Sequence, residues 1–469
     1  MNKTIQKYFF IMLAAVLLPS IALAQTALTF TNAAATGKTG PTQAQVNTAY
    51  DGTTLDDAVT INTTGIQEWT VPATGTYTIE VYGAQGGRSY LLSTSNWYDG
   101  GKGAKMVGDF SLSQGDVLKI MVGQQGVENP NNSRGAGGGG GTYVVLSSGT
   151  TLLIAAGGGG GAGDYAYVQH GQTSTSATAG GNSSGNTGGG SGGSNGAGGS
   201  YSSHSAGGAG WSANGGSNHV GGGSSFSNGG LGGAGYGEGK DGGFGGGGGS
   251  YAGAGGGGGY SGGGGGNWSY SGNGGGGGSY IKDTASNTSS TAGENEGHGK
   301  IVITYCTGFC FESAAVVANN SYVDITFTAG AYNTNGGSGA LEAADFSLTF
   351  SRNGGPATAA SISSVKKNNN ASEGSAGALS GGETVVRMFL NITGSPAGVE
   401  SILIKAANGS SIYNSGGTAM NAASGVGDNL NDVNGPYITV TTLNALNASV
   451  AVTLSEAAYN TNGGSGALE

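Results

Sequence analysis

The sequence predicts an all-β protein. Short segments with alternating apolar and polar residues recur along the chain and are separated by Gly-rich turns, whereas a single short segment favours a helix. Of the 469 residues, 104 are Gly, about three times the usual share of roughly 7%. Short strands at regular spacing with such turns are typical of β-sandwiches.

The first 24 residues predict a signal peptide. Lys3 and Lys7 precede a short apolar run, and Ala22–Ala24 has the small-residue pattern of a cleavage site. Residues 1–24 are therefore expected to be removed, with Gln25 as the mature N-terminus of an exported, extracellular or cell-surface protein. No later stretch approaches 18 apolar residues, so no transmembrane segment is expected in this chain.

The charge and the motifs argue against several function classes. A net charge of −10 opposes binding to nucleic acid or to anionic membranes. Gly192–Gly196 matches the G-x-S-x-G pattern of hydrolases, but it lies in Gly/Ser low-complexity sequence without a preceding strand. We therefore expect no enzymatic activity, no catalytic residue and no cofactor-binding residue, with Ca²⁺ as the one cofactor alternative.

The expected elements can be taken in order. A helix is expected at Thr42–Tyr50, because Pro41 stands at its start. Alternation and flanking turn residues indicate the strands. These strands cover residues 68–71, 76–82, 105–110, 117–122, 142–146 and 151–156, then 300–305 after a glycine-dense insert, and 383–390 and 401–405 further on.

The insert, residues 135–279, contains 64 Gly in 145 residues. Gly-rich chain can act as a flexible linker, because ordering Gly is entropically costly. The alternative is an ordered bundle of extended threefold glycine helices, whose outward N–H and C=O groups pair between neighbours. Equal run lengths and interrupting aromatic residues favour order. The six runs of five glycines are 137–141, 157–161, 245–249, 255–259, 262–266 and 274–278.

Several motifs of the chain resemble those of a known family in their ordered sequence and not only in their glycine content. Gly65–Pro72, Tyr82–Gly87, Ala155–Gly161 and Gly297–Ile303 resemble the glycine-rich domain family. That family includes the extracellular module of the anaplastic lymphoma kinase and leukocyte tyrosine kinase receptors, and many bacterial surface proteins. The resemblance covers roughly residues 25–305 and implies a jelly-roll-like β-sandwich with an inserted polyglycine-helix bundle, here assigned to residues 25–306. The chain contains no kinase, so the receptors' cytokine binding and signalling do not carry over.

The C-terminal part predicts a tandem repeat. Ala331–Glu342 recurs letter for letter at Ala458–Glu469, an offset of 127 residues. We expect an Ig-like β-sandwich repeat at 312–435, similar to the repeats of large bacterial surface adhesins, and the start of a second, truncated repeat at 436–469. Because so short a start cannot bury a core, the sequence is expected to be a fragment of a longer protein.

Two sets of residues at the ends of the repeat are candidate structural sites, one for a disulfide and one for Ca²⁺. Cys306 and Cys310 are the two cysteines of the chain, and export permits a disulfide between them, with free thiols as the alternative. Oxygen-bearing side chains near residue 430 are weak Ca²⁺ candidates, with a solvated linker as the competing interpretation. These side chains are Asp428, Asn431, Asp432 and Asn434.

Aromatic side chains in polar or glycine-rich surroundings are the candidate ligand-binding residues. They are Trp97, Tyr98, Trp211 and Trp268, and packing against the glycine bundle is their alternative role. The function expected is that of a secreted or cell-surface, adhesin-like binding protein. A glycine-rich head would recognise a surface glycan or protein, and Ig-like repeats would act as a spacer. The alternative is a structural surface-layer or extracellular-matrix component without a specific ligand.

Overall fold

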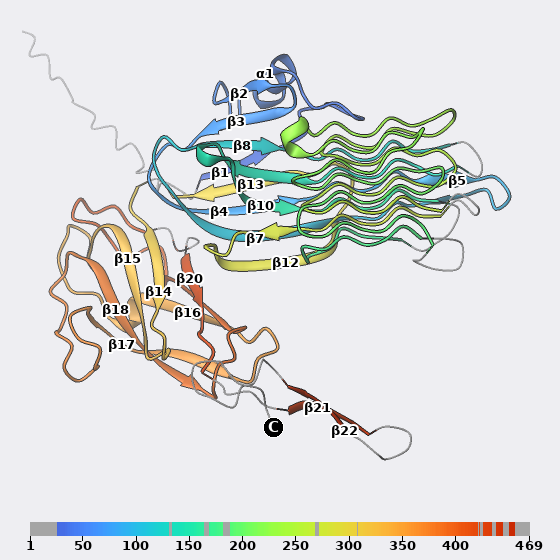
Figure 1. Ribbon diagram of the computed structural model, residues 1–469. Helices are drawn as coiled ribbons and strands as arrows, with labels where there is room; N and C mark the ends of the chain where they lie inside the picture. The colour runs from blue at the N-terminus through green and yellow to red at the C-terminus, as the bar shows by residue number, and fades with distance from the viewer. Residues whose placement is uncertain are drawn as a thin grey trace, which may run out of the picture.

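The computed structural model describes residues 26–130, 134–163, 168–181, 188–267, 272–306, 308–420, 422, 425–433, 438–443 and 450–454. The expected signal peptide therefore lies outside the described residues. The described chain is almost entirely β-structure, with one α-helix (Figure 1). The predicted all-β class is confirmed.

The strands of the N-terminal part, called the head, are β1 (Thr26–Phe30), β2 (Val59–Thr63), β3 (Ile66–Thr70), β4 (Gly75–Tyr82), β5 (Ser89–Leu91), β6 (Asn96–Tyr98), β7 (Gly103–Leu112), β8 (Val117–Met121), β9 (Thr142–Leu146), β10 (Thr151–Ala156), β11 (Tyr280–Ile281), β12 (Ser286–Asn295) and β13 (Lys300–Tyr305). Those that follow are β14 (Phe311–Val316), β15 (Tyr322–Ala331), β16 (Phe346–Ser351), β17 (Ala359–Lys367), β18 (Glu383–Thr393), β19 (Ser401–Ala406), β20 (Gly425–Asn429), β21 (Ile438–Leu443) and β22 (Val450–Leu454).

The head is a β-sandwich of two antiparallel sheets. One sheet has the strand order β1-β13-β4-β7-β12, and the other has the order β11-β10-β9-β8-β3-β2. Alternate side chains of both sheets point inward, as the period of two requires. Ile79 of β4, Ile120 of β8 and Ile303 of β13 are fully buried in one common core.

Helix α1 (Gln43–Tyr50) covers one end of this core. Thr42 caps the helix: its backbone N–H donates to the Gln45 side chain at 3.0 Å, and the Gln45 N–H donates back to the Thr42 hydroxyl. Val46 and Tyr50 are buried against the sandwich. The predicted helix is confirmed, but Pro41 lies just before the capping residue and not inside the first turn.

The glycine insert, together with residues 83–87, continues the strands of the sandwich as long extended segments that lie side by side (Figure 1). Residues 83–87 follow β4, residues 157–161 follow β10, and residues 137–141 lead into β9. All six five-glycine runs are buried. This arrangement favours the ordered alternative over the flexible linker.

Hydrogen bonds inside this bundle of extended segments repeat every three residues. The N–H groups of residues 255 and 258 donate to the carbonyls of 136 and 139, and those of 256 and 259 donate to 206 and 209. Residues 257 and 260 donate to 275 and 278. One run thus bonds to three neighbours in turn, which is the pattern that a threefold extended helix predicts. The helical conformation of the runs remains a prediction.

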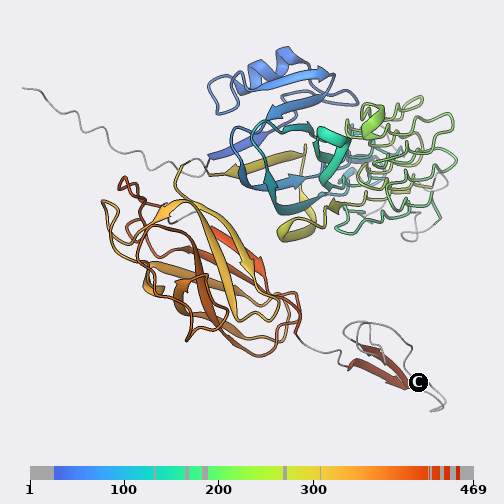
Figure 2. The same ribbon diagram turned by 60° about the vertical axis from the view of Figure 1, so that its left-hand side comes forward.

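The Ig-like repeat is a second sandwich with its own core. Its sheets have the orders β14-β15-β18-β17 and β16-β19-β20, and Val323, Ile325 and Ile404 are among its fully buried side chains. Beyond it, β21 pairs with β22 as a separate hairpin (Figure 2). The pair Ile438↔Leu454 repeats the pair Phe311↔Phe327 of β14 and β15 at the offset of 127 residues. The repetition seen in the sequence is therefore also a repetition of strand register.

The head and the repeat meet at the end of the sandwich opposite the glycine bundle (Figure 1). Cys306 and Cys310 form a disulfide at this junction, with a Cα–Cα distance of 6.4 Å. The Asn287 side chain of the head donates to the Gly427 carbonyl of the repeat at 2.7 Å. The free end of the bundle consequently lies on the side of the head that faces away from the repeat.

Candidate functional site

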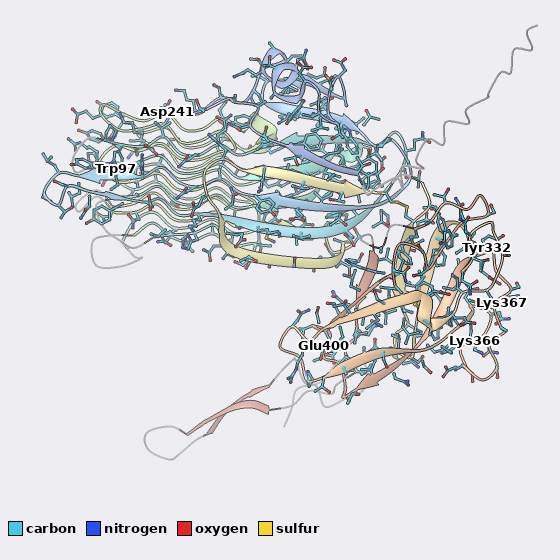
Figure 3. The ribbon with its side chains drawn as sticks, turned by 180° about the vertical axis from the view of Figure 1, so that it is seen from behind. Trp97, Asp241, Tyr332, Lys366, Lys367 and Glu400 are labelled. Atoms are coloured by element: carbon cyan, nitrogen blue, oxygen red, sulfur yellow. A yellow bond between two sulfur atoms is a disulfide. The ribbon has the colours of Figure 1, made fainter. Side chains whose placement is uncertain are left out.

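A two-stranded hairpin projects at the free end of the bundle. Tyr90 of β5 pairs with Trp97 of β6, and their ring centroids are 5.3 Å apart because directly paired residues share one face of a hairpin. The Arg88 guanidinium lies 4.4 Å from the centre of the Trp97 ring, and its Nε is 2.8 Å from Oε1 of Glu128. Trp97 is 41% exposed at the tip of the molecule (Figure 3). Arg88, Tyr90, Trp97 and Glu128 are called the Trp97 cluster.

A second aromatic group surrounds Tyr251. The Arg134 guanidinium lies 4.8 Å from the centre of the Tyr251 ring, and its Nε is 3.8 Å from a carboxylate oxygen of Glu238. The Tyr251 ring also contacts the rings of Tyr236, at 5.4 Å, and His204, at 5.6 Å. His219 lies 5.1 Å from His204 and 5.2 Å from Tyr236. The Tyr251 cluster consists of Arg134, His204, His219, Tyr236, Glu238 and Tyr251.

Two hydrogen bonds connect the two clusters. Glu128 belongs to the Trp97 cluster and Arg134 to the Tyr251 cluster. The Tyr90 N–H donates to the Asn129 carbonyl at 2.9 Å, and the Ser89 hydroxyl donates to the Arg134 carbonyl at 2.7 Å. The hairpin is therefore held to Asn129 and to Arg134, and the two clusters form one region, called the bundle-end surface.

The bundle-end surface offers aromatic faces next to balanced charges. Each cluster contains one arginine and one glutamate, and the side chains of Arg88 and Glu128 are 44% and 42% exposed. Ion pairs as exposed as these contribute only about 0–1 kcal/mol to folding. Trp, Tyr and Arg are the residues that dominate binding energy at interfaces. The surface can therefore bind a ligand by stacking and hydrogen bonding.

The histidines of the Tyr251 cluster add groups that both donate and accept hydrogen bonds. Burial lowers the pKa of His204, and the neighbouring His219 and Arg134 lower it further because a second positive charge is unfavourable there. His204 is therefore neutral at physiological pH. Its neutral ring has one donor nitrogen and one acceptor nitrogen.

The structure separates the four aromatic residues predicted from the sequence. Trp97 is in the Trp97 cluster, and Tyr98 is the next residue of β6, half-buried and paired with Ser89. Trp211 packs against Phe226 and Tyr143, with ring centroids 5.0 and 6.3 Å apart. This contact agrees with the packing alternative for Trp211. Trp268 lies outside the described residues.

Most of the bundle-end surface was not predicted from the sequence. Arg88, Arg134 and Tyr251 stand far apart along the chain in Gly-rich surroundings, where no motif marks them. The sequence signal that could have identified the two arginines is the scarcity of positive charge, since only 16 residues of the chain are Lys or Arg. An arginine within a glycine-dense segment is therefore informative by itself.

The candidate Ca²⁺ ligands have other contacts. The Asp428 carboxylate accepts the Val316 N–H at 2.9 Å, and burial raises its pKa. The Asn431 side chain donates to the Val317 carbonyl at 3.1 Å, and Asn320 donates to the Asn431 carbonyl at 2.8 Å. Asp428 and Asn431 thus connect β20 and the residues after it to β14, so this segment is not simply a solvated linker. Asp432 is exposed, and Asn434 lies outside the described residues.

A cleft of about 390 Å³ lies between the head and the repeat. Both carboxylate oxygens of Asp109 are used there, because one accepts the Thr78 hydroxyl at 2.6 Å and the other accepts the Asn287 amide at 2.7 Å. The polar groups of this cleft serve the junction. Within the described parts of the chain, no three His, Cys, Asp or Glu side chains gather where they could hold a metal ion.

The comparison with known proteins finds similarity for one segment of the chain. A segment of 101 residues, 21% of the chain, is 38% identical to the leukocyte tyrosine kinase receptor of Mus musculus. The similar segment spans 11% of that receptor's length. No family model matches the chain. In the described residues, no helix is long and apolar enough to cross a membrane.

Proposed function

We propose that this protein is an adhesin-like extracellular binding protein without enzymatic activity. Its bundle-end surface recognises the ligand, and its Ig-like repeats act as a spacer. The observation that carries the proposal is the gathering of aromatic and arginine side chains with the exposed Trp97, which lies at the end of the bundle that faces away from the repeat (Figure 3).

Two further findings support the proposal. The similarity to a segment of a receptor is compatible with an extracellular or cell-surface binding module. The repeated register of the β14–β15 and β21–β22 hairpins is typical of tandem modules that extend a chain. Loops on a rigid scaffold are where recognition residues concentrate, and the packed glycine segments supply such a scaffold.

The test uses the whole protein and panels of immobilised surfaces. The protein is applied to whole cells, extracellular-matrix proteins and printed oligosaccharides, and bound protein is measured against concentration. We expect saturable binding that the Trp97→Ala and Arg88→Ala variants weaken at an unchanged melting temperature. The matched control is Lys366→Ala in the repeat, which should bind like the original protein.

Two results would contradict the proposal. Saturable binding that is unchanged in both bundle-end variants would place recognition elsewhere on the molecule. Ordered self-assembly in light scattering, without binding to any panel, would instead support the structural surface-layer or matrix role.

A further inference from the structure

We propose that the ligand of the bundle-end surface is an uncharged oligosaccharide, with sugar rings stacked on Trp97 and Tyr251 and hydroxyls bonded by the adjacent arginine–glutamate pairs. This inference rests on the proposed function, whose site it uses.

The charge of the surface favours an uncharged ligand. The guanidinium of Arg88 lies 2.8 Å from the Glu128 carboxylate, and that of Arg134 lies 3.8 Å from the Glu238 carboxylate. A polyanionic ligand would have to compete with these carboxylates, and the net charge of −10 opposes its approach. A polycationic ligand would meet the two arginines in the same way. The two clusters therefore present a locally neutral surface.

The hydrogen-bonding groups match hydroxyls. A sugar hydroxyl both donates and accepts, arginine only donates and an ionised glutamate only accepts. Each cluster places one of each at an aromatic ring, with the guanidinium over one face of that ring. A sugar ring that lies on the opposite face can therefore extend adjacent hydroxyls past the ring edge to both groups. A neutral His204 adds a group that can do either.

The layout favours an extended ligand over a protein. The cores of protein–protein interfaces are enriched in Tyr, Trp and Arg but depleted in Glu, whereas here a glutamate accompanies the arginine in each cluster. The clusters are joined by the Ser89–Arg134 and Tyr90–Asn129 hydrogen bonds. A ligand with several rings can occupy both platforms, which a single sugar cannot do.

The test applies the full chain to a printed array of neutral, sialylated and sulfated oligosaccharides, beside an array of extracellular-matrix proteins. We expect selective binding to neutral oligosaccharides that changes little between ~0.1 and ~1 M salt, because screening affects charged contacts. Trp97→Ala and Tyr251→Ala should each weaken binding tenfold or more, whereas Trp97→Phe should retain most of it. Leu231→Ala, which removes an exposed apolar side chain elsewhere in the insert, is the control.

The outcomes separate this inference from the proposed function. Binding to proteins alone, lost in Trp97→Ala, would overturn the oligosaccharide ligand and leave the binding role intact. Salt-sensitive binding to sialylated or sulfated sugars would overturn the uncharged class. Absence of binding on both arrays and on whole cells would count against both proposals. If Trp97→Ala changes the melting temperature, Arg88→Ala takes its place, since it retains both aromatic rings of the hairpin.

Discussion

The Gly257→Ala variant tests whether close backbone packing holds the glycine insert together. A Cβ at this position would lie 2.8 Å from the carbonyl carbon of Gly158 and 2.9 Å from the carbonyl oxygen of Gly159, closer than the 3.0 Å limit for real Cβ atoms. These neighbours are backbone atoms in buried runs, so they cannot rotate away. Relief requires the segments to separate, which strains the Gly257–Gly275 and Gly277–Gly158 hydrogen bonds, each 2.8–2.9 Å long.

The magnitude follows from these contacts. Overpacking costs about 1–3 kcal/mol, and two weakened hydrogen bonds cost about 1 kcal/mol each. A Gly-to-Ala change recovers about 0.4–1 kcal/mol through the unfolded state. The net loss is about 2–4 kcal/mol, which lowers the melting temperature of a domain of this size by roughly 5–15 °C.

The assay follows tryptophan fluorescence during denaturation, because all four Trp lie in the head. The control is Gly75→Ala at the start of β4, where a Cβ would have no neighbour within 4 Å. We also expect hydrogen-exchange protection at residues 245–267 and 272–278 that is comparable to the strands and is reduced in Gly257→Ala. Equal melting of the two variants, with free exchange in both segments, would refute the packed bundle and restore the linker.

Three further predictions concern the stability of the two sandwiches. Asp324→Asn should destabilise the repeat by about 2–3 kcal/mol, because it removes the charge that pairs with the largely buried Arg387, whose two bonds to Asp324 are 2.7 Å long. Lys367→Ala, at a 3.9 Å pair in which the lysine side chain is 40% exposed, should cost under ~0.5 kcal/mol in the same circular-dichroism melts. Burial lowers the pKa of His298, whose Nδ1 accepts the Gln125 N–H. The head should therefore be most stable above about pH 6.5 and lose stability as the pH falls, and His298→Asn should flatten that pH dependence in urea titrations. Replacing Cys306 and Cys310 by Ser should lower the unfolding free energy of the repeat by about 2 kcal/mol, which is the value expected for so short a disulfide loop. An unchanged unfolding free energy would mean that the disulfide does not constrain the unfolded chain.

The strands that sequence analysis predicted are those whose apolar alternation reflects burial. The expected strand 76–82 lies within β4, where Tyr77, Ile79 and Val81 point into the core. The segment Ser286–Asn295 was not predicted, because it contains no large apolar residue. It becomes β12 by pairing with β7 at the edge of its sheet, where most of its side chains remain exposed. Backbone pairing, which propensity does not record, determines this strand.

The candidate site was less predictable than the fold for a related reason. Trp97 is recognisable from sequence because Trp is rare and has a large aromatic side chain. Once the hairpin is known, its pairing identifies Tyr90 as the neighbour of Trp97. Arg134 and Tyr251 are 117 positions apart in the sequence, yet their side chains are in contact. They meet because the residue after Arg134 pairs with the residue after Tyr251, as the Gly135–Ala252 hydrogen bond shows. Since glycine runs have no side-chain pattern to specify register, their pairing cannot be deduced from sequence alone.

The same absence of side chains links the bundle to the proposed function. Inside the bundle the space beside most glycine Cα atoms is occupied by a neighbouring carbonyl, as at Gly256 beside Gly263 and at Gly274 beside Gly255. Large side chains are therefore disfavoured in the body of the bundle, and the places where its segments turn are better suited to present them. The hairpin with Trp97 is such a turn. A scaffold made of backbone thus confines recognition residues to its ends and holds them there by hydrogen bonds between segments distant in sequence.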